Sequence, residues 1–253
     1  MIRAVIFDLG GTLLNFDGNA QDWRGVEERG IAALYRHLAE HGHALPEREF
    51  GQVIWEEIRR GWTAAMSGHD NACLVSILGA ALARLGLSLD DATRMRAARI
   101  YASGVDEPVV PFDGARELLQ QLKERGLRVG LLSNTAWPSE FHLQEIDKFK
   151  LTGFFDAMAF SCELGAWKPN AKAFQHVTDR LGVSPAEAIY VGDMPQIDVA
   201  GAQRAGLRAV WMAALPRELG EVKPDATIHH LSELPAVLDH WSRNQSEASH
   251  VDY

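Results

Sequence analysis

Five short apolar runs stand out in the pattern of hydrophobic and polar positions along this chain. Each is four or five residues long, and helical patterns or turn-forming residues separate one from the next. Runs of this length and composition are typical of strands that are buried on both faces of a parallel sheet. The predicted strands cover residues 4–7, 128–132, 157–160, 188–191 and 209–212.

Helical patterns alternate with the later strands. Residues 113–125 begin with an aspartate suited to capping, place three leucines on one face and end before a glycine. Further helices are predicted over residues 170–181, after a proline, and over residues 197–205, before a glycine. Because alternating strands and helices form parallel sheets covered on both faces, we expect an α/β fold with a doubly wound sheet.

The region between the first two predicted strands is of a different kind. It contains no strand-like run, and Gly42, Gly68, Gly86 and Gly104 each follow a helical pattern, at positions suited to helix ends. The stretch Ser88-Leu89-Asp90-Asp91 resembles a capping box at the start of the last pattern. We therefore expect an insert of about four helices. The predicted organisation is a core domain of residues 1–15 and 107–242, a helical cap of residues 16–106 and a disordered tail of residues 243–253.

The composition limits the kinds of partner this chain can have. With 253 residues, 47% of them hydrophobic, it is long enough to bury a sizeable core. Its net charge of −9 argues against nucleic acids and anionic membranes as partners, because both need clustered Lys and Arg. The two cysteines, Cys73 and Cys162, form no disulfide framework or metal-binding pattern. The chain opens directly on a predicted strand and has no long uncharged stretch, so we expect a cytoplasmic protein with a small-molecule substrate.

Three aspartates are predicted to meet at one edge of the sheet. Asp8 ends the first strand, Asp193 follows the fourth, and Asp198 lies five residues later. With the fourth strand beside the first, these carboxylates converge where open α/β sheets bind ligands. Carboxylates at that range repel one another unless one is protonated or a cation neutralises them. Oxygen ligands with an open position for phosphate suit Mg²⁺.

Further groups with affinity for phosphate lie near the same edge. After Asp8, the pair Gly10-Gly11 lets backbone N–H groups approach an anion closely. Ser133 and Asn134 follow the second strand with a hydroxyl and an amide, which can donate hydrogen bonds to phosphoryl oxygens. Lys168 places an ammonium group ahead of a predicted helix. Together these residues predict a phosphate site.

In their order along the chain, these motifs resemble the four motifs of the haloacid dehalogenase (HAD) superfamily. The stretches concerned are Asp8-Leu9-Gly10-Gly11-Thr12, Leu131-Leu132-Ser133-Asn134-Thr135, Trp167-Lys168-Pro169-Asn170, and Gly192-Asp193 with Asp198. Residues 224–234 resemble the family's C-terminal strand and helix, so the resemblance spans nearly the whole chain. It implies a Rossmann-like core with a helical cap, hydrolase activity and Mg²⁺ as cofactor.

The resemblance also implies roles for individual residues. Asp8 would attack phosphorus and form an aspartyl phosphate, while Ser133 and Lys168 would bind the transferring group and complete the catalytic set. The phosphate-binding residues would be Gly11, Thr12, Ser133, Asn134 and Lys168. The metal ligands would be Asp8, the carbonyl oxygen of Gly10, Asp193 and Asp198.

The first motif departs from the family's phosphatase pattern at Gly10. That pattern reads Asp-x-Asp-x-Thr, and the second Asp protonates the leaving oxygen and later activates water. Gly10 can do neither. We therefore expect either leaving groups that depart unprotonated, such as acyl, enol or aryl groups, or a substitute acid from the cap.

The function we expect is Mg²⁺-dependent hydrolysis of a small phosphorylated metabolite, and two alternatives stay open. The first is a dehalogenase, which also lacks an Asp at the position of Gly10; dehalogenases need no metal, however, and Asp193 and Asp198 argue against one. The second is a phosphate-binding or regulatory protein that kept the metal site but turns over little. A phosphonate-cleaving enzyme is excluded, because its Schiff-base lysine would lie in the cap and no Lys precedes Lys123.

Aromatic residues of the predicted cap could line a substrate pocket. Trp23, Trp55 and Trp62 recur at helical spacing, a pattern that is more often part of a core, and the neighbouring Arg59-Arg60 is more often solvated. We therefore interpret the tryptophans as core residues and the two arginines as solvated. The sequence carries no signal for an oligomeric state.

Overall fold

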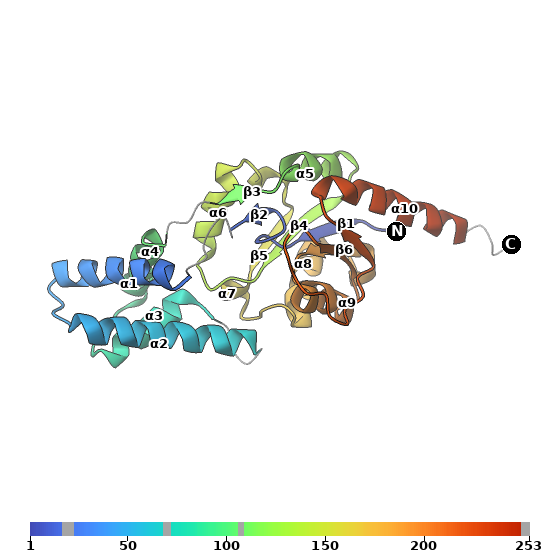
Figure 1. The fold of residues 1–253 in the computed structure, drawn as a ribbon. Coiled ribbons are helices and arrows are strands. Elements are labelled where there is room, and N and C mark those ends of the chain that lie inside the picture. Colours follow the sequence, from blue (N-terminus) through green and yellow to red (C-terminus); the bar gives the residue numbers. More distant parts are fainter. Residues whose placement is uncertain (17–22, 68–71, 106–108, 249–253) are drawn as a thin grey trace.

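A six-stranded parallel sheet forms the centre of the larger half of the molecule. The computed structural model describes residues 1–16, 23–67, 72–105 and 109–248 (Figure 1). The strand order is β5-β4-β1-β6-β7-β8, so β1 lies between β4 and β6, as expected from the sequence. The strands are β1 (Ala4–Phe7), β4 (Arg128–Ser133), β5 (Ala157–Phe160), β6 (Ala188–Gly192), β7 (Arg208–Met212) and β8 (Ala226–Ile228).

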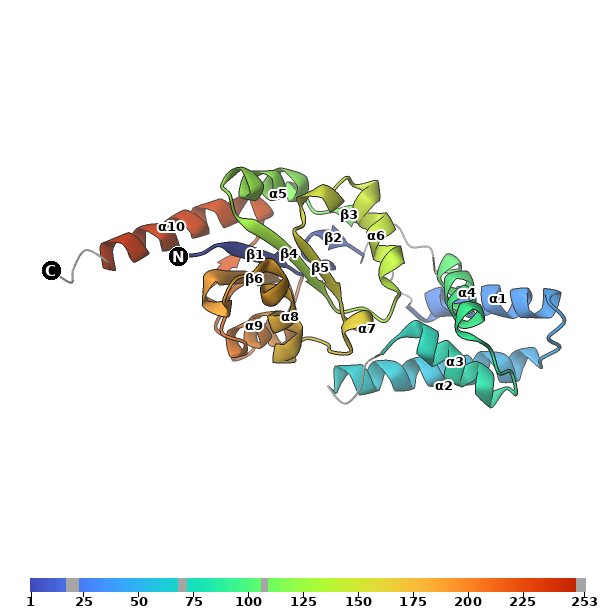
Figure 2. The same ribbon diagram turned by 180° about the vertical axis from the view of Figure 1, so that it is seen from behind.

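Helices cover both faces of this sheet, which confirms the predicted α/β fold. Val5 and Phe7 of β1 face one apolar cluster, and Ala4 and Ile6 face another, because successive side chains of a strand point to opposite faces. Figures 1 and 2 show α5 and α10 over one face and α8 and α9 over the other. The helices of this half are α5 (Ala115–Glu124), α6 (Ser139–Lys148), α7 (Ser161–Leu164), α8 (Ala171–Leu181), α9 (Ala200–Arg204) and α10 (Leu234–Ala248).

Four helices form a second body beside the sheet, the expected helical cap (Figure 1). They bury an apolar core of their own around Leu34, Phe50, Leu78 and Tyr101. The cap helices are α1 (Trp23–Glu40), α2 (Glu47–Met66), α3 (Leu74–Arg84) and α4 (Asp91–Ser103).

The cap is joined to the sheet half by a short ribbon and by packing. The ribbon pairs β2 (Leu14–Asn15) with β3 (Val110–Pro111) in antiparallel fashion. Ala136 and Trp167 of the sheet half belong to the cap's apolar core, and the N–H of Leu74 donates to the carbonyl oxygen of Ala136 at 2.7 Å. Arg99 of α4 forms two hydrogen bonds with Glu140 of α6, at 2.7 and 2.8 Å.

Several helix ends differ from the sequence predictions. Helix α5 starts after Gly114, whose φ of 78° is left-handed, rather than on the Asp113 cap. Helix α4 is capped by Asp90, which accepts from the N–H of Thr93, and not by Ser88. Gly104 ends α4 in a right-handed conformation, whereas Gly42 and Gly86 are left-handed as expected. Gly68 lies outside the described residues.

The C-terminal segment also differs. Helix α10 continues to Ala248, so residues 243–248 are helical rather than disordered; residues 249–253 lie outside the described part. The reason is local, because residues 243–248 contain neither proline nor glycine and continue a helix already held by packing of Val237 and Trp241.

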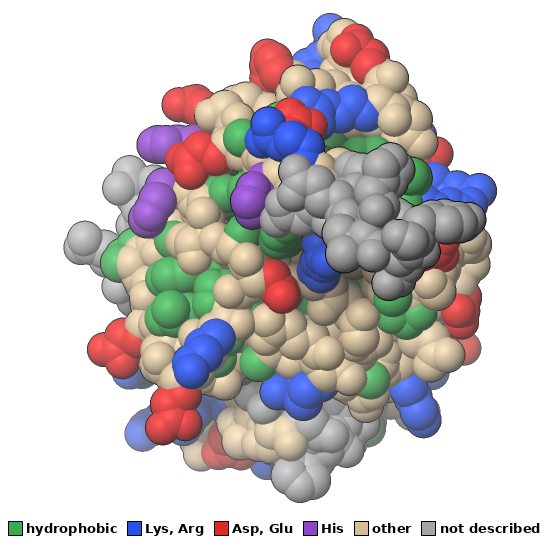
Figure 3. Space-filling model, turned by 90° about the vertical axis from the view of Figure 1, so that its right-hand side faces the viewer, with side chains coloured by type: hydrophobic (Ala, Val, Ile, Leu, Met, Phe, Trp, Pro, Cys, Tyr) green, Lys and Arg blue, Asp and Glu red, His purple; other side chains and the backbone are tan. Residues whose placement is uncertain are grey.

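The surface shows mixed charges on the side opposite the cap. On the face in Figure 3, basic and acidic side chains are interspersed, without a continuous basic patch on that face. None of the helices in the described residues is both long and apolar enough to cross a membrane.

Candidate active site

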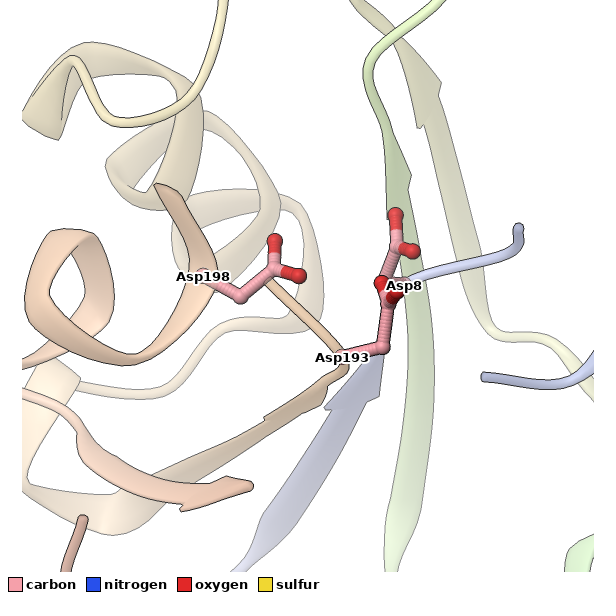
Figure 4. Close-up of side chains that lie close together, drawn as sticks. All are labelled: Asp8, Asp193 and Asp198. Carbon is pink, nitrogen blue, oxygen red and sulfur yellow. The ribbon is translucent and has the colours of Figure 1, made fainter. Parts of the chain in front are cut away.

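Three buried carboxylates meet at the carboxyl edge of the sheet. Phe7 is in register with Val191 of β6, and the N–H of Asp8 donates to the carbonyl oxygen of Val191 at 2.9 Å, so Asp8 and Asp193 leave adjacent strand ends. Asp198 comes from a π-helical turn (Pro195–Val199) where an ordinary helix was predicted. One carboxylate oxygen from each residue lies within 4.8 Å of the others. Figure 4 shows the three side chains close together. The predicted convergence of these aspartates is therefore present.

Two cations face this cluster. The Lys168 ammonium donates to Asp8 Oδ1 at 2.6 Å, to Asp198 Oδ1 at 2.8 Å and to the Tyr190 hydroxyl at 2.7 Å. Lys168 is only 3% exposed, so these bonds form away from water. The guanidinium of Arg217, in the segment after β7, donates to Asp193 Oδ2 at 3.1 Å. Arg217 was not among the predicted site residues.

Burial and mutual repulsion change the acidity of the cluster. Burial raises the pKa of Asp8 to about 7, with the charges of Asp198 and Asp193 adding to the rise and Lys168 opposing it. Burial likewise raises the pKa of Asp193 to about 6, with Asp198 adding and Arg217 opposing. Burial would lower the pKa of Lys168, but the charges of Asp198 and Asp8 hold it above its usual value. Asp8 and Asp193 therefore release their protons closer to neutral pH than ordinary carboxyl groups do.

Two glycines shape the space around the cluster. Gly11 has a φ of 79°, and a Cβ there would lie 2.5 Å from Asp193 Oδ2. Only glycine fits that position. Gly10 is not left-handed, and a Cβ there would lie 3.3 Å from Cδ2 of Phe16. An aromatic ring therefore lies directly beside the position where the side chain of the family's second Asp would begin.

All but one of the predicted site residues line a single cavity. Asp8, Gly10, Gly11, Ser133, Asn134, Lys168, Asp193 and Asp198 belong to its walls. Asn134 also fixes Lys168, because its amide donates to the Lys168 carbonyl at 2.9 Å and its Oδ1 accepts the Lys168 N–H at 2.8 Å. Thr12 is the exception: it is fully buried outside the cavity lining, and its hydroxyl has no hydrogen-bond partner among the described residues.

The cavity of about 690 Å³ extends from the aspartates to the cap. The sequence favoured a core role for Trp55 and Trp62 and a solvated one for Arg59. All three line the cavity, and Trp55 also packs against the apolar core of the cap. The Trp23 side chain lies outside the described residues. Sequence reasoning missed other wall residues as well: Phe16, Glu27, Thr135, Trp137, His142, Trp167 and Arg217. Thr135 and Arg217 follow strands, which was a usable signal, whereas nothing local marks Glu27 or His142.

Comparisons with known proteins agree with this geometry. Glyceraldehyde 3-phosphate phosphatase of Methanopyrus kandleri is 28% identical over 244 residues, covering 94% of this chain and 97% of that protein. Phosphoserine phosphatase of Thermus thermophilus is 36% identical over 129 residues, covering 49% of each. Among solved structures, a 2-haloacid dehalogenase of Pseudomonas syringae pv. Tomato has a TM-score of 0.67 and 27% identity, covering 95% of this chain and all of that one.

The haloacid dehalogenase-like hydrolase family matches residues 2–206, most of the chain. That match includes the sheet edge with the three aspartates and Lys168. The similar proteins include one named as a phosphatase and one named as a dehalogenase. This protein is therefore an enzyme of the haloacid dehalogenase-like hydrolase family.

Proposed function

We propose that this hydrolase is a Mg²⁺-dependent phosphatase that acts on a small phosphorylated compound through an aspartyl phosphate on Asp8. The observation that carries the proposal is the buried cluster of Asp8, Asp193 and Asp198 beside Lys168, at one end of a cavity. Phosphatase names among the relatives, such as the Methanopyrus protein, support the same reaction class.

The residues at the cluster fit a magnesium ion. Their donors are oxygen atoms, the carboxylates are buried, and Gly11 leaves the space beside Asp193 free of side-chain atoms. Asp8, the Gly10 carbonyl oxygen, Asp193 and Asp198 would hold the ion. When bound, Mg²⁺ would neutralise charge on the transferring phosphoryl group and on the carboxylates.

The chain's own residues would do the remaining work. A carboxylate oxygen of Asp8 would attack phosphorus while the bond to the leaving oxygen breaks, and water would later cleave the aspartyl phosphate. Lys168 keeps Asp8 oriented and offsets its charge, and the Ser133 hydroxyl would donate to a phosphoryl oxygen. The inserted helices, predicted to span residues 16–106, would act as the cap that excludes water and contacts the leaving group through Trp55 and Trp62.

Dehalogenation of a small haloacid is the second candidate. Gly10 favours it, because a halide departs as an anion and needs no proton. The clustering of Asp8, Asp193 and Asp198 disfavours it, because dehalogenation needs no metal ion, whereas three buried carboxylates this close together suit one.

One experiment separates these reactions. Wild-type protein is incubated with a panel of phosphate esters and haloacids, with Mg²⁺ or with EDTA, and inorganic phosphate and halide are measured. We expect Mg²⁺-dependent release of phosphate, and a phosphoryl group that hydroxylamine removes, as it does from an acyl phosphate, on wild type but not on Asp8→Asn. Halide release that survives EDTA would contradict the proposal and support dehalogenation. Phosphate binding without turnover would support the regulatory alternative.

A further inference from the structure

Gly10 offers no side chain for proton transfer at this site, and Phe16 lies next to it. Its ring lies beside Gly10, so the place of the family's second Asp is apolar. A phosphate ester with a basic leaving oxygen still needs a proton as the bond to phosphorus breaks. The proposed phosphatase reaction, on which this inference rests, therefore needs another group on the cavity wall to supply that proton.

A hydroxyl, an imidazole and a carboxylate form a continuous chain at the cavity wall. Thr135 Oγ1 lies 2.7 Å from His142 Nε2, and His142 Nδ1 lies 3.0 Å from Glu145 Oε2. Thr135 follows β4, two residues beyond Ser133, and both Thr135 and His142 line the cavity that holds Asp8. Glu145 lies on α6, nearly one turn after His142 and away from the cavity lining.

The surroundings hold this chain in one arrangement. The imidazole of His142 stacks on Phe160 with ring centroids 5.7 Å apart, and the Phe16 ring packs perpendicular to it with centroids 5.9 Å apart. Ser161 holds the backbone of Thr135 through two hydrogen bonds. Its hydroxyl oxygen accepts the Thr135 N–H at 2.8 Å, and its hydroxyl donates to the Thr135 carbonyl oxygen at 3.1 Å. The side chain of His142 is 12% exposed, so water has little access to the ring.

The donors and acceptors of Thr135 make its hydroxyl sensitive to the charge of His142. Thr135 Oγ1 accepts the N–H of Trp137 at 2.9 Å, which uses one of its two lone pairs. When the imidazole is neutral and its Nδ1–H faces Glu145, the Thr135 hydroxyl donates to Nε2. When the imidazole is protonated, Nε2–H donates to Oγ1, and both lone pairs are then used. The hydroxyl hydrogen is released from His142 and becomes available to the cavity.

We propose that His142 and Thr135 form a proton relay that replaces the missing carboxyl at position 10. In the first step Asp8 bonds to phosphorus, the bond from phosphorus to the leaving oxygen breaks, the Thr135 hydroxyl proton moves to that oxygen, and the Nε2 proton of His142 moves to Thr135. In the second step the protons return along the same path from the attacking water as the aspartyl phosphate is cleaved. Glu145 stabilises the imidazolium that is present before the first step and restored by the second. The relay belongs to the sheet half and not to the cap, where a substitute acid was expected.

The test compares leaving groups of different basicity. The value of kcat/KM is measured with dinitrophenyl, phenyl and alkyl phosphates for wild type and His142→Gln. For His142→Gln we expect the alkyl and phenyl rates to fall by about 10²-fold or more, and the dinitrophenyl rate by less than about fivefold, because a good leaving group needs no acid. Thr135→Val should reproduce this pattern and Thr135→Ser should stay near wild type. His176→Gln, at an exposed position on α8, is the matched control.

Each other outcome refutes the relay. An equal loss with all leaving groups would mean that His142 only holds the structure or binds substrate, and unchanged rates would mean that it has no role. If kcat/KM depends more steeply on the basicity of the leaving group in Glu27→Gln but not in His142→Gln, the proton donor is Glu27 of the cap. If His142→Gln fails to melt cooperatively, Thr135→Val and Thr135→Ser test the relay through the same comparison of leaving groups. Dinitrophenyl phosphate turnover that Asp8→Asn abolishes tests the phosphatase reaction itself, independently of the relay.

Discussion

Glu27 of helix α1 should make the protein's stability depend on pH. Its side chain lines the cavity, and its buried Oε2 has no hydrogen-bond partner among the described residues. Burial raises its pKa from an ordinary 4.5 to about 7. Between these pH values the unfolded chain loses a proton that the folded protein keeps, so the free energy of unfolding falls as pH rises. At about 1.4 kcal/mol per pKa unit, the loss reaches at most about 3 kcal/mol above pH 7.

The variant Glu27→Gln isolates this effect, because glutamine keeps the shape and does not titrate. Urea unfolding of both proteins from pH 4 to pH 8, followed by circular dichroism, gives the difference in free energy of unfolding. We expect no difference near pH 4 and an advantage of up to about 3 kcal/mol for the variant near pH 8. Glu28→Gln is the control, since Glu28 is exposed and pairs with Arg24 at 3.0 Å. An advantage that is constant with pH, or equal in both variants, would refute the reasoning.

Three further predictions concern the aspartate cluster. Asp8→Asn should lower kcat/KM by at least about 10³-fold while the melting temperature stays level or rises, since it removes the nucleophile and one repelling charge; a smaller loss of activity would exclude Asp8 as the nucleophile. Mg²⁺ should raise the melting temperature in proportion to the logarithm of its concentration, and Asp193→Asn should reduce that shift; an unchanged shift would exclude Asp193 as a ligand. Gly11→Ala should abolish the Mg²⁺-induced shift in melting temperature, because its Cβ would lie 2.5 Å from Asp193 Oδ2. Gly42→Ala, at a similar φ but in open space, should cost only about 1–2 kcal/mol in strain and leave the shift in place. Equal loss of the shift in both variants would contradict the steric argument.

The features that local sequence controls could be predicted well. Each predicted strand forms, because an apolar run of four or five residues between turns is too short for a helix and can bury its side chains on both faces of a parallel sheet. Asp8 and Asp193 follow those strands directly, so their convergence needed only the strand order. Helix ends were less predictable, since Ser88 and Asp90 can both cap a helix and packing decides which one does.

The groups missing from the sequence prediction depend on contacts between distant segments. His142 becomes notable only because the loop after β4 brings Thr135 to its ring, and because Phe16, from the other end of the chain, packs against it. Glu27 is an ordinary polar position of an amphipathic helix until the sheet half closes one side of it. Neither arrangement leaves a periodic pattern or a motif in the sequence.

The tryptophans around the cavity should make the intrinsic fluorescence of this protein report ligand binding. Of the seven in the chain, Trp55, Trp62, Trp137 and Trp167 line the cavity, and Trp62 meets Trp167 edge to face with ring centroids 5.5 Å apart. Because indole emission responds to polarity and to nearby rings, a molecule entering the cavity should change the intrinsic fluorescence directly. Candidate substrates can therefore be ranked by titration with unlabelled protein, including compounds that bind without being hydrolysed.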